Sequence, residues 1–229
     1  MTEQRRPRTR VHDFSISLDG FGTGEGLTQD QPFGHAGQRL HEWMFSTATG
    51  RAMIGRGGGT RGVDEALVAR SRHGIGAEIM GRRKFHTGTG TGPLPDDWRG
   101  WWGEDPPFGT PVLVLTHHPR PPIEMAGGTT FHFLDLPPAE ALAWARDAAG
   151  GLDVHVGGGV STLRAFLDAD LVDDLHLVVV PVVLGRGQRL WDGLEGLERR
   201  FDVEQVATPS GVVHVTMTRR EKRAGRRTA

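Results

Sequence analysis

The apolar runs of this chain predict its strands. Val11 to Leu18 alternates apolar and polar positions and predicts a first strand, which Asp19-Gly20-Phe21-Gly22 ends. Residues 77–80 predict a short buried strand that stops at Gly81, and the continuous apolar run at 111–116 predicts a strand covered on both faces. The remaining predicted strands are 129–133, 154–156, 175–183 and a closing hairpin of 201–207 and 212–218.

Helical patterns lie between several of these strands. Residues 64–70 have helical composition, and Asp64 is placed to cap the start and to interact with the helix dipole. Pro137-Pro138 opens a second helix that stops at Gly150-Gly151, and 161–168 form a third. Because strands and helices alternate and the end is antiparallel, we expect an α/β fold with a mixed sheet flanked by helices.

Two long segments have no regular pattern. Residues 22–62 are rich in glycine and threonine, with one short helix expected around 41–45, and a loop of this length is a candidate for covering a ligand. The second segment carries Trp98, Trp101, Trp102 and Phe108 among glycines and prolines. These rings either stack on a flat heterocycle or pin the loop to the body or to another subunit.

Composition excludes several kinds of chemistry. The 229 residues contain no cysteine and no tyrosine, so disulfides, thiolate ligands, cysteine nucleophiles and a tyrosine proton donor are excluded. The histidines show no HExxH or paired metal spacing, and we expect no metal site. No apolar run is long enough to span a bilayer, and we expect a cytoplasmic protein that binds no membrane.

Charge is distributed unevenly along the chain. Residues 1–10 carry a net +3 and 219–229 a net +5, so a total of −1 leaves the body near −9. A nucleic-acid binder usually has a basic folded face instead, and we expect no nucleic-acid partner. We interpret 1–10 and 221–229 as disordered basic tails around one domain, 11–220.

A glycine-rich turn is the clearest candidate binding element. Val154 to Val156 runs into Gly157-Gly158-Gly159 and then into a helix. Backbone without Cβ atoms approaches phosphates closely, and the first amides of a helix carry partial positive charge. Thr162 stands where the dinucleotide fingerprint has its third glycine, and the Walker lysine is absent. The turn therefore indicates phosphate binding without specifying the ligand.

Several motifs taken in order resemble a known family. They are Ser17-Leu18-Asp19-Gly20, Ile79-Met80-Gly81-Arg82-Arg83, Val114-Leu115-Thr116, Gly157-Gly158-Gly159 and the segment Pro181-Val182-Val183-Leu184-Gly185-Arg186-Gly187. Together they resemble the dihydrofolate reductase-like family, nearest to the reductase domain of the riboflavin-biosynthesis deaminase-reductase. The resemblance covers about residues 10–220. It implies a three-layer fold with a mostly parallel central sheet, NADPH as hydride donor, and a homodimer.

The resemblance also implies which residues hold the cofactor. Gly81, Arg82 and Arg83 would open a helix that binds cofactor phosphates. The adenosine 2′-phosphate would lie beside Thr116, His117 and His118. The pyrophosphate and the nicotinamide would be held by Gly157, Gly158, Gly159, Val160, Ser161 and Thr162. Two arginines inside an acidic body suit a phosphate-rich ligand.

Two carboxylates are candidates for the proton donor. An ungapped match to dihydrofolate reductases puts Glu65 at the position of their substrate-binding acid, although acidic residues at a helix start are commonly dipole partners. Asp19 lies in a motif that adjoins the nicotinamide in the riboflavin branch, although an aspartate in a turn often bonds its own backbone. The sequence does not choose between them.

These patterns predict an NADPH-dependent reductase that transfers hydride to a heterocyclic or ribosylaminopyrimidine substrate. A dihydrofolate or pterin reductase is the alternative within this class. A non-catalytic NADP-binding sensing module is the alternative of another class. Because cysteine is absent, the zinc-dependent deaminase half of the riboflavin enzyme is excluded.

Overall fold

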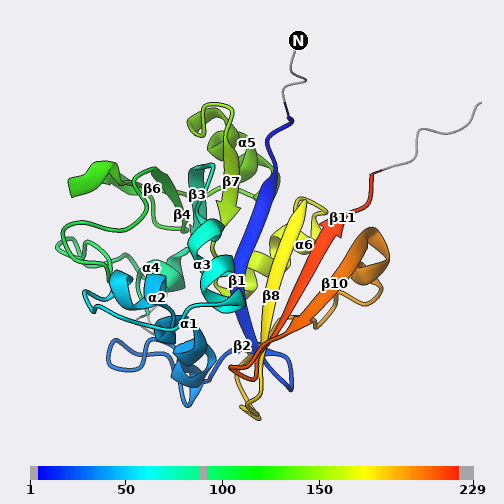
Figure 1. Ribbon diagram of the computed structural model, residues 1–229. Coiled ribbons are helices and arrows are strands. Elements are labelled where there is room, and N and C mark those ends of the chain that lie inside the picture. The colour runs from blue at the N-terminus through cyan, green and yellow to red at the C-terminus, as the bar shows by residue number, and fades with distance from the viewer. Residues whose placement is uncertain (1–4, 88–91, 222–229) are drawn as a thin grey trace, which may run out of the picture.

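A computed structural model describes residues 5–87 and 92–221 of the chain (Figure 1). The described residues form one nine-stranded sheet in the order β10-β11-β8-β1-β7-β3-β4-β6-β5, and a small second sheet pairs β2 with β9. The main-sheet strands are β1 (Thr9–Ser17), β3 (Ile75–Gly81), β4 (Pro111–Leu115), β5 (Arg120–Glu124), β6 (Thr130–Leu134), β7 (Asp153–Val156), β8 (Asp174–Val180), β10 (Phe201–Ala207) and β11 (Val213–Arg219). The small-sheet strands are β2 (Phe21–Thr23) and β9 (Gln188–Arg189).

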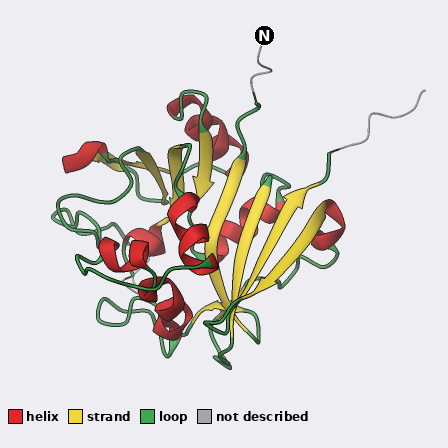
Figure 2. Ribbon diagram, in the orientation of Figure 1, coloured by secondary structure: helices red, strands yellow, loops and turns green. Residues whose placement is uncertain are grey.

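Helices cover both faces of the main sheet (Figure 2). The α-helices are α1 (Glu42–Ser46), α2 (Ala48–Met53), α3 (Val63–Ser71), α4 (Arg82–Phe85), α5 (Pro138–Ala148) and α6 (Val160–Asp168). Short 3-10 turns are η1 (Gly37–His41), η2 (Ala126–Gly128) and η3 (Leu197–Arg200). No helix among residues 5–87 and 92–221 has both the length and the apolar character of a membrane span.

The sheet separates the apolar core into layers because neighbouring residues of a strand face opposite sides. Ile79 packs with α5 and α6 in one cluster, whereas the adjacent Met80 packs with Phe85 of α4 in another. Val178 and Val180 of β8 pack with Val68 of α3 in a third cluster. The six strands from β8 to β6 run parallel. At one edge β5 pairs antiparallel with β6, and at the other β11 pairs antiparallel with β8 and β10 with β11. The predicted three-layer, mostly parallel fold with its closing hairpin is confirmed.

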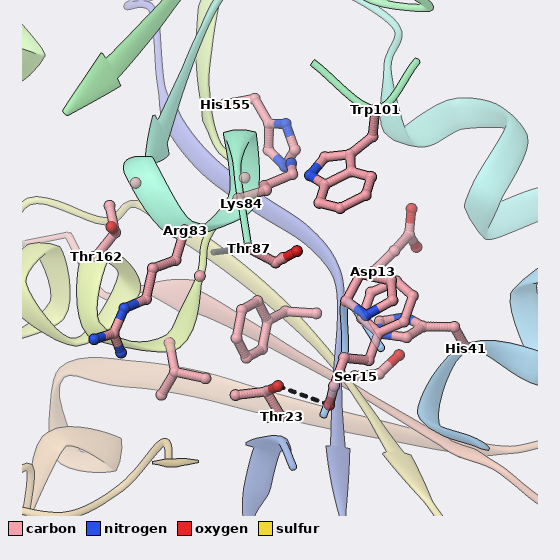
Figure 3. Close-up of a pocket in the computed structure, with 18 of the residues that line it drawn as sticks. Asp13, Ser15, Thr23, His41, Arg83, Lys84, Thr87, Trp101, His155 and Thr162 are labelled. Atoms are coloured by element: carbon pink, nitrogen blue, oxygen red, sulfur yellow. Dashed lines mark hydrogen bonds between the residues drawn. The ribbon is translucent and has the colours of Figure 1, made fainter. Parts of the chain in front are cut away.

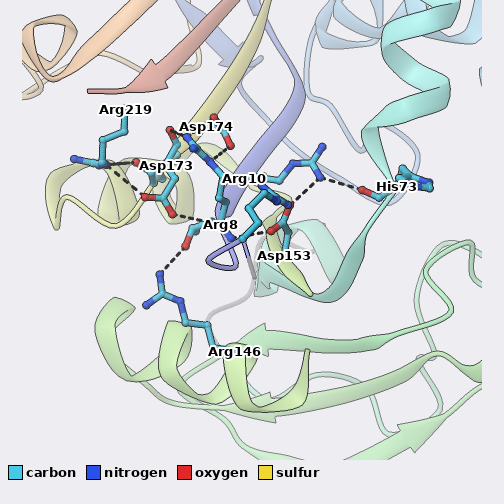
Figure 4. A network of polar contacts seen from close by, with 11 residues as sticks. Arg8, Arg10, His73, Arg146, Asp153, Asp173, Asp174 and Arg219 are labelled. Atoms are coloured by element: carbon cyan, nitrogen blue, oxygen red, sulfur yellow. Dashed lines mark hydrogen bonds and ion pairs between the residues drawn. The ribbon is translucent and has the colours of Figure 1, made fainter. Parts of the chain in front are cut away.

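The first strand begins two residues before the predicted start at Val11. β1 begins at Thr9, and Arg8 is fixed by two bonds to Asp174, with Nε–Oδ2 2.5 Å and Nη2–Oδ1 2.7 Å (Figure 4). Arg5 and Arg10 both reach the buried carboxylate of Asp153. Ion pairing therefore holds residues 5–10 on the sheet, while 1–4 and 222–229 of the predicted tails lie outside the described residues.

The structure also contains a strand that was not predicted. β5 pairs antiparallel with β6 at the edge of the sheet and carries Pro121 and Pro122. Proline cannot donate a ladder hydrogen bond, so its presence argues against a central strand but is tolerated at an edge. The strand predicted at 175–183 is observed as β8, and it ends at Val180.

Candidate functional site

A cavity of about 890 Å³ opens at the carboxyl ends of β3, β4 and β7, beneath α1, α2 and the segment before them. In open α/β sheets, ligands bind at this end of the strands. The cavity is lined by residues from both long segments that lack a regular pattern and from the turns after these three strands (Figure 3). Its two halves differ in chemistry.

One half is built where the ends of β3 and β7 meet. The N–H of Gly81, the last residue of β3, donates a 2.8 Å hydrogen bond to the carbonyl oxygen of Gly158. A Cβ atom at Gly81 would overlap the hydroxyl oxygen of Thr162 on α6. Gly158 has φ +97°, a conformation that glycine adopts without strain. The two predicted phosphate-binding segments are therefore in direct contact.

The start of α6 faces this half of the cavity. Gly159 caps the helix without a side-chain hydrogen bond, and no acidic residue stands in the first turn. Val160, Ser161 and Thr162 all line the cavity. Unbonded amides and the positive end of a nine-residue helix favour an anion at this point.

Two arginines follow directly on Gly81. α4 is only four residues long, so its contribution is the two side chains rather than a helix dipole. Arg82 donates from Nη2 to the carbonyl oxygen of Gly92 at 2.8 Å, and burial together with the neighbouring Arg83 lowers its pKa. Arg83 is exposed at the cavity wall, and no acidic residue of the described chain pairs with it. Its charge is available to a ligand.

The residues after β4 are only partly gathered at the cavity. Thr116 and His117 line it, whereas His118 does not, and the N–H of His118 donates to the Thr116 hydroxyl at 3.1 Å. Asp135, which follows β6, also lines the cavity and lies 3.0 Å from His117, Oδ1 to Nδ1. Sequence reasoning missed this carboxylate beside the expected 2′-phosphate position.

Beneath the glycine turn lies a buried ionic cluster. Glu78 of β3 is 1% exposed and is contacted by Lys84 at 2.9 Å, His155 at 3.2 Å and Arg72 at 3.7 Å. Burial alone would raise the pKa of Glu78, but the charges of Lys84, His155 and Arg72 outweigh it and hold the pKa well below its usual range. A Cβ at Gly157 would overlap the Glu78 carboxylate and the Lys84 ammonium group, so glycine lets the turn lie close over this cluster. Lys84 and Arg72 therefore share one buried counter-charge, which leaves one positive charge in excess among these three residues.

The other half of the cavity contains buried polar atoms that the described protein leaves unbonded. They are Nε2 of His12, Oδ1 of Asp13, Nε1 of Trp101 and Nε2 of His155. Buried polar groups are normally paired, so a group of them around one cavity indicates a polar ligand edge. Figure 3 draws Asp13, Trp101 and His155 around the same space.

Asp13 reaches the cavity through an irregularity in β1. The register between β1 and β8 shifts between Val11 and Phe14, and Asp13 has φ +52°. Such bulges redirect side chains and occur beside active sites. The sequence signal for this residue is the pair of adjacent polar residues His12-Asp13, which interrupts the alternation of the strand.

An apolar wall closes this half. Phe33, Met44, Phe45, Met53 and Ile54, all from the 22–62 segment, line it, which fits the prediction that this segment covers a ligand. His41 joins them, and burial together with Lys84 lowers its pKa to about 4, so its imidazole is neutral at neutral pH. The wall offers flat, uncharged surface to a ligand.

The tryptophan segment divides between the cavity and the body of the protein. Trp101, Trp102 and Phe108 line the cavity. Trp98 instead donates from Nε1 to the carbonyl oxygen of Phe85 at 2.9 Å and pins the segment to the body.

Neither carboxylate predicted as proton donor lines the cavity. Glu65 accepts from the N–H of Thr49 at 2.9 Å and from its hydroxyl at 2.7 Å, and these bonds lower its pKa. Burial alone would raise the pKa of Asp19, but hydrogen bonds from Ser17, Gly185 and Leu184 lower it to about 2. The carboxylate of Asp64 bonds His214 instead of capping α3.

Comparison with known proteins agrees with this architecture. Residues 11–215 match the family model of the RibD C-terminal domain. No curated protein sequence matches the chain. Among solved structures, a Shewanella sp. PV-4 protein named for riboflavin biosynthesis is 21% identical with TM-score 0.57, and the match covers 93% of this chain and 99% of that one.

Two further structures share the fold at lower identity. A pyrimidine reductase-like protein of Corynebacterium diphtheriae is 14% identical with TM-score 0.51, over 94% of this chain and 93% of that one. The diaminohydroxyphosphoribosylaminopyrimidine deaminase/5-amino-6-(5-phosphoribosylamino)uracil reductase of Thermotoga maritima is 16% identical with TM-score 0.52, over 93% of this chain and 57% of that one. At these identities the likeness shows the fold, and the family follows from the sequence model. The chain belongs to the family of the RibD C-terminal domain.

Proposed function

We propose that this protein is an NADPH-dependent reductase that transfers hydride to a heterocyclic substrate, with ribosylaminopyrimidines as the first class to test. The observation that carries the proposal is the contact between Gly81 and Gly158 at a cavity whose other half holds unbonded polar atoms and an apolar wall. Membership of the RibD C-terminal domain family supports it.

The cofactor half suits a dinucleotide with phosphate groups. The amides at the start of α6 and the glycines before it would bind the pyrophosphate. Arg83 and Arg82 would add charge-assisted bonds. Thr116, His117 and His118 remain our proposal for the adenosine side, with Asp135 as an additional group there. A reduced nicotinamide bound in this half supplies a hydride to an acceptor in the other half.

The substrate half suits the edge of a planar heterocycle. Nε1 of Trp101 is a donor and the Asp13 carboxylate an acceptor, so together they match a ring with both C=O and N–H groups. Phe33, Met44 and Phe45 offer apolar surface to the ring faces and exclude water. We propose Asp13 as the residue that supplies a proton to the reduced bond, in preference to Glu65 and Asp19, because it alone of the three lines the cavity.

The test is NADPH oxidation by purified protein with a panel of dihydropteridines and of ribosylaminopyrimidines with and without the 5′-phosphate. Oxidation with one panel member supports the proposal and identifies the class. Lys84 and Arg72 line the cavity and share the single charge of Glu78, so one positive charge remains there. Comparison of phosphorylated with unphosphorylated members shows whether this charge serves the substrate. NADPH binding without oxidation of any member would favour the non-catalytic sensing module.

We further propose a homodimer. Leu18 and Val183, at the carboxyl ends of β1 and β8, are 62% and 63% exposed, which suits a contact with a second copy. Light scattering during size exclusion measures the mass directly, and a monomer at all concentrations would remove this proposal. The cytoplasmic location expected from the sequence stays a prediction.

A further inference from the structure

We propose that Asp13, His176, His214 and Asp64 form a proton path that reloads Asp13 from solvent between catalytic cycles. The inference deepens the proposed function, because it assumes that Asp13 gives a proton to the substrate. The path itself rests on contacts that do not depend on the identity of the substrate.

The four side chains make an unbroken series of close contacts. Oδ1 of Asp13 lies 3.3 Å from Nδ1 of His176. Nε2 of His176 lies 3.0 Å from Nδ1 of His214, and Nε2 of His214 lies 2.9 Å from Oδ1 of Asp64. The imidazole rings are nearly parallel, with 19° between their planes. The contacts between His176 and His214 and between His214 and Asp64 are hydrogen bonds, whereas the Asp13 carboxylate must turn toward Nδ1 of His176 to form one.

Strand register places these residues side by side. His176 of β8 stands opposite the bulge of β1, where His12 and Asp13 take the place of one residue. In β11, Thr216 pairs with His176 and His214 pairs with Val178, so the two histidines are diagonal neighbours across the β8–β11 ladder. Asp64 reaches His214 from the first turn of α3.

The path connects two different environments. At the inner end, Oδ1 of Asp13 is buried at the cavity wall and has no hydrogen-bond partner in the described chain. At the outer end, Asp64 is 13% exposed and bonded by the hydroxyls of Ser210 and Thr208, of which Ser210 is exposed. A proton that enters at Asp64 therefore has a route to the cavity through two buried rings.

Other ionisable groups near the path do not interrupt it. His12 and His155 stand beside Asp13, with Glu78 behind them, and burial lowers the pKa of His12, so this imidazole stays neutral. Burial also lowers the pKa of His214, against the opposing effect of Asp64. The ring of Trp43 packs against His214 at 84°, with 5.2 Å between the ring centroids.

The transfer balances with one proton in and one out. Burial alone would raise the pKa of Asp64, but hydrogen bonds with His214, Ser210 and Thr208 lower it, so Asp64 rests ionised and must first take a proton from solvent. If each ring begins with its hydrogen on Nδ1, Asp64 passes this proton to Nε2 of His214, His214 gives its Nδ1 hydrogen to Nε2 of His176, and His176 gives its Nδ1 hydrogen to Asp13. Each ring then carries its hydrogen on Nε2. The N–H of Asp13 lies 3.3 Å from Nδ1 of His176 and can donate to it when the ring carries its hydrogen on Nε2, the tautomer that follows such a transfer.

The rings must return to the opposite tautomers before the next transfer. The path therefore governs repeated turnovers rather than the first one. If the histidine pair were purely structural, its substitution would lower the rates of the first and of later turnovers equally, or would lower neither rate. This difference separates the two roles.

The first measurement is ¹⁵N NMR of the histidine rings in the unliganded protein and needs no activity. We expect concordant tautomers, with His176 and His214 protonated on the same nitrogen type, Nε2 in both or Nδ1 in both. Discordant rings, with two hydrogens or none between Nε2 of His176 and Nδ1 of His214, would overturn the path. This result stands even if no substrate is found and the proposed function fails.

The second measurement compares single-turnover with steady-state NADPH oxidation, using whichever panel member is reduced. His214→Gln and Asp64→Asn should keep the single-turnover rate within about twofold and lower the steady-state rate roughly tenfold or more. Asp64→Asn retains an acceptor oxygen for His214, so it tests proton transfer without loss of the hydrogen bond. Glu140→Gln, an exposed change on α5, is the control. An equal fall in both rates, or no fall in either, would overturn the path.

Discussion

The N–H of Gly81 donates a 2.8 Å hydrogen bond to the carbonyl oxygen of Gly158. This bond joins the end of β3 to the turn after β7 and brings the two arginines of α4 to the glycines that precede α6. Parallel neighbouring strands end at the same edge of the sheet, which is why two distant segments share one cavity. The proposed cofactor site depends on this junction.

Gly81→Ala should weaken NADPH binding. Its new Cβ would overlap the hydroxyl oxygen of Thr162, so β3 and α6 would separate and the protein would lose about 1–3 kcal/mol of stability. Calorimetric titration and thermal unfolding measure the two effects. Gly57→Ala is the matched control, because its Cβ would meet no atom within 4 Å. Equal binding by Gly81→Ala and the control would contradict a tight junction.

Arg83→Gln should raise the Kd for NADPH roughly tenfold, the cost of one charge-assisted contact to phosphate. The salt dependence of binding should also become shallower. Arg70→Gln, an exposed change on α3 outside the cavity, should have no effect. If Arg83→Gln behaves like Arg70→Gln at low and high salt, Arg83 does not contact the cofactor.

Asp135→Asn should increase the preference for NADPH over NADH. The Asp135 carboxylate lies beside His117, where we propose the 2′-phosphate, and removing its charge removes repulsion of that phosphate. The ratio of the two Kd values is the measurement, with Asp147→Asn on α5 as the control. An unchanged ratio would place the 2′-phosphate elsewhere.

Asp13→Asn and Glu65→Gln decide which carboxylate supplies the proton. We expect Asp13→Asn to lower turnover by about 10²–10⁴-fold with little change in NADPH binding. Glu65 is bonded to Thr49 outside the cavity, so its substitution should act through α2 and α3 instead. If turnover is lost in Glu65→Gln and retained in Asp13→Asn, the assignment from the sequence is the right one.

Glu78→Gln should destabilise the protein at neutral pH by about 3 kcal/mol, because Lys84 and Arg72 would lose their buried counter-charge. The pKa of Glu78 is lowered by folding, so its contribution is present above the unfolded pKa and is lost as pH falls through the folded pKa. Denaturant unfolding at neutral and at acidic pH should show the two proteins converging as pH falls. A difference that is constant with pH would contradict an ionised Glu78.

The order of elements was predictable because buried parallel strands are continuous apolar runs, as at Val112 to Val114. The meeting of two candidate segments was predictable where it depends on strand ends, as at Gly81, the last residue of β3, and Gly157, the first residue after β7. Asp13 was not, because a bulge cannot be read from alternation and the shifted register reverses which side chain faces the cavity. The contacts of Asp64 and Arg8 were missed for another reason: their partners, His214 and Asp174, lie far away in the sequence.

Titration of the purified protein with NADPH, followed through tryptophan fluorescence, tests the central claim most directly. Trp101 and Trp102 line the cavity, so a cofactor bound there should quench the emission with saturation in the micromolar range typical of such cofactors. The quenching should weaken in Gly81→Ala and be retained in Gly57→Ala. No saturable change up to millimolar NADPH would contradict the account.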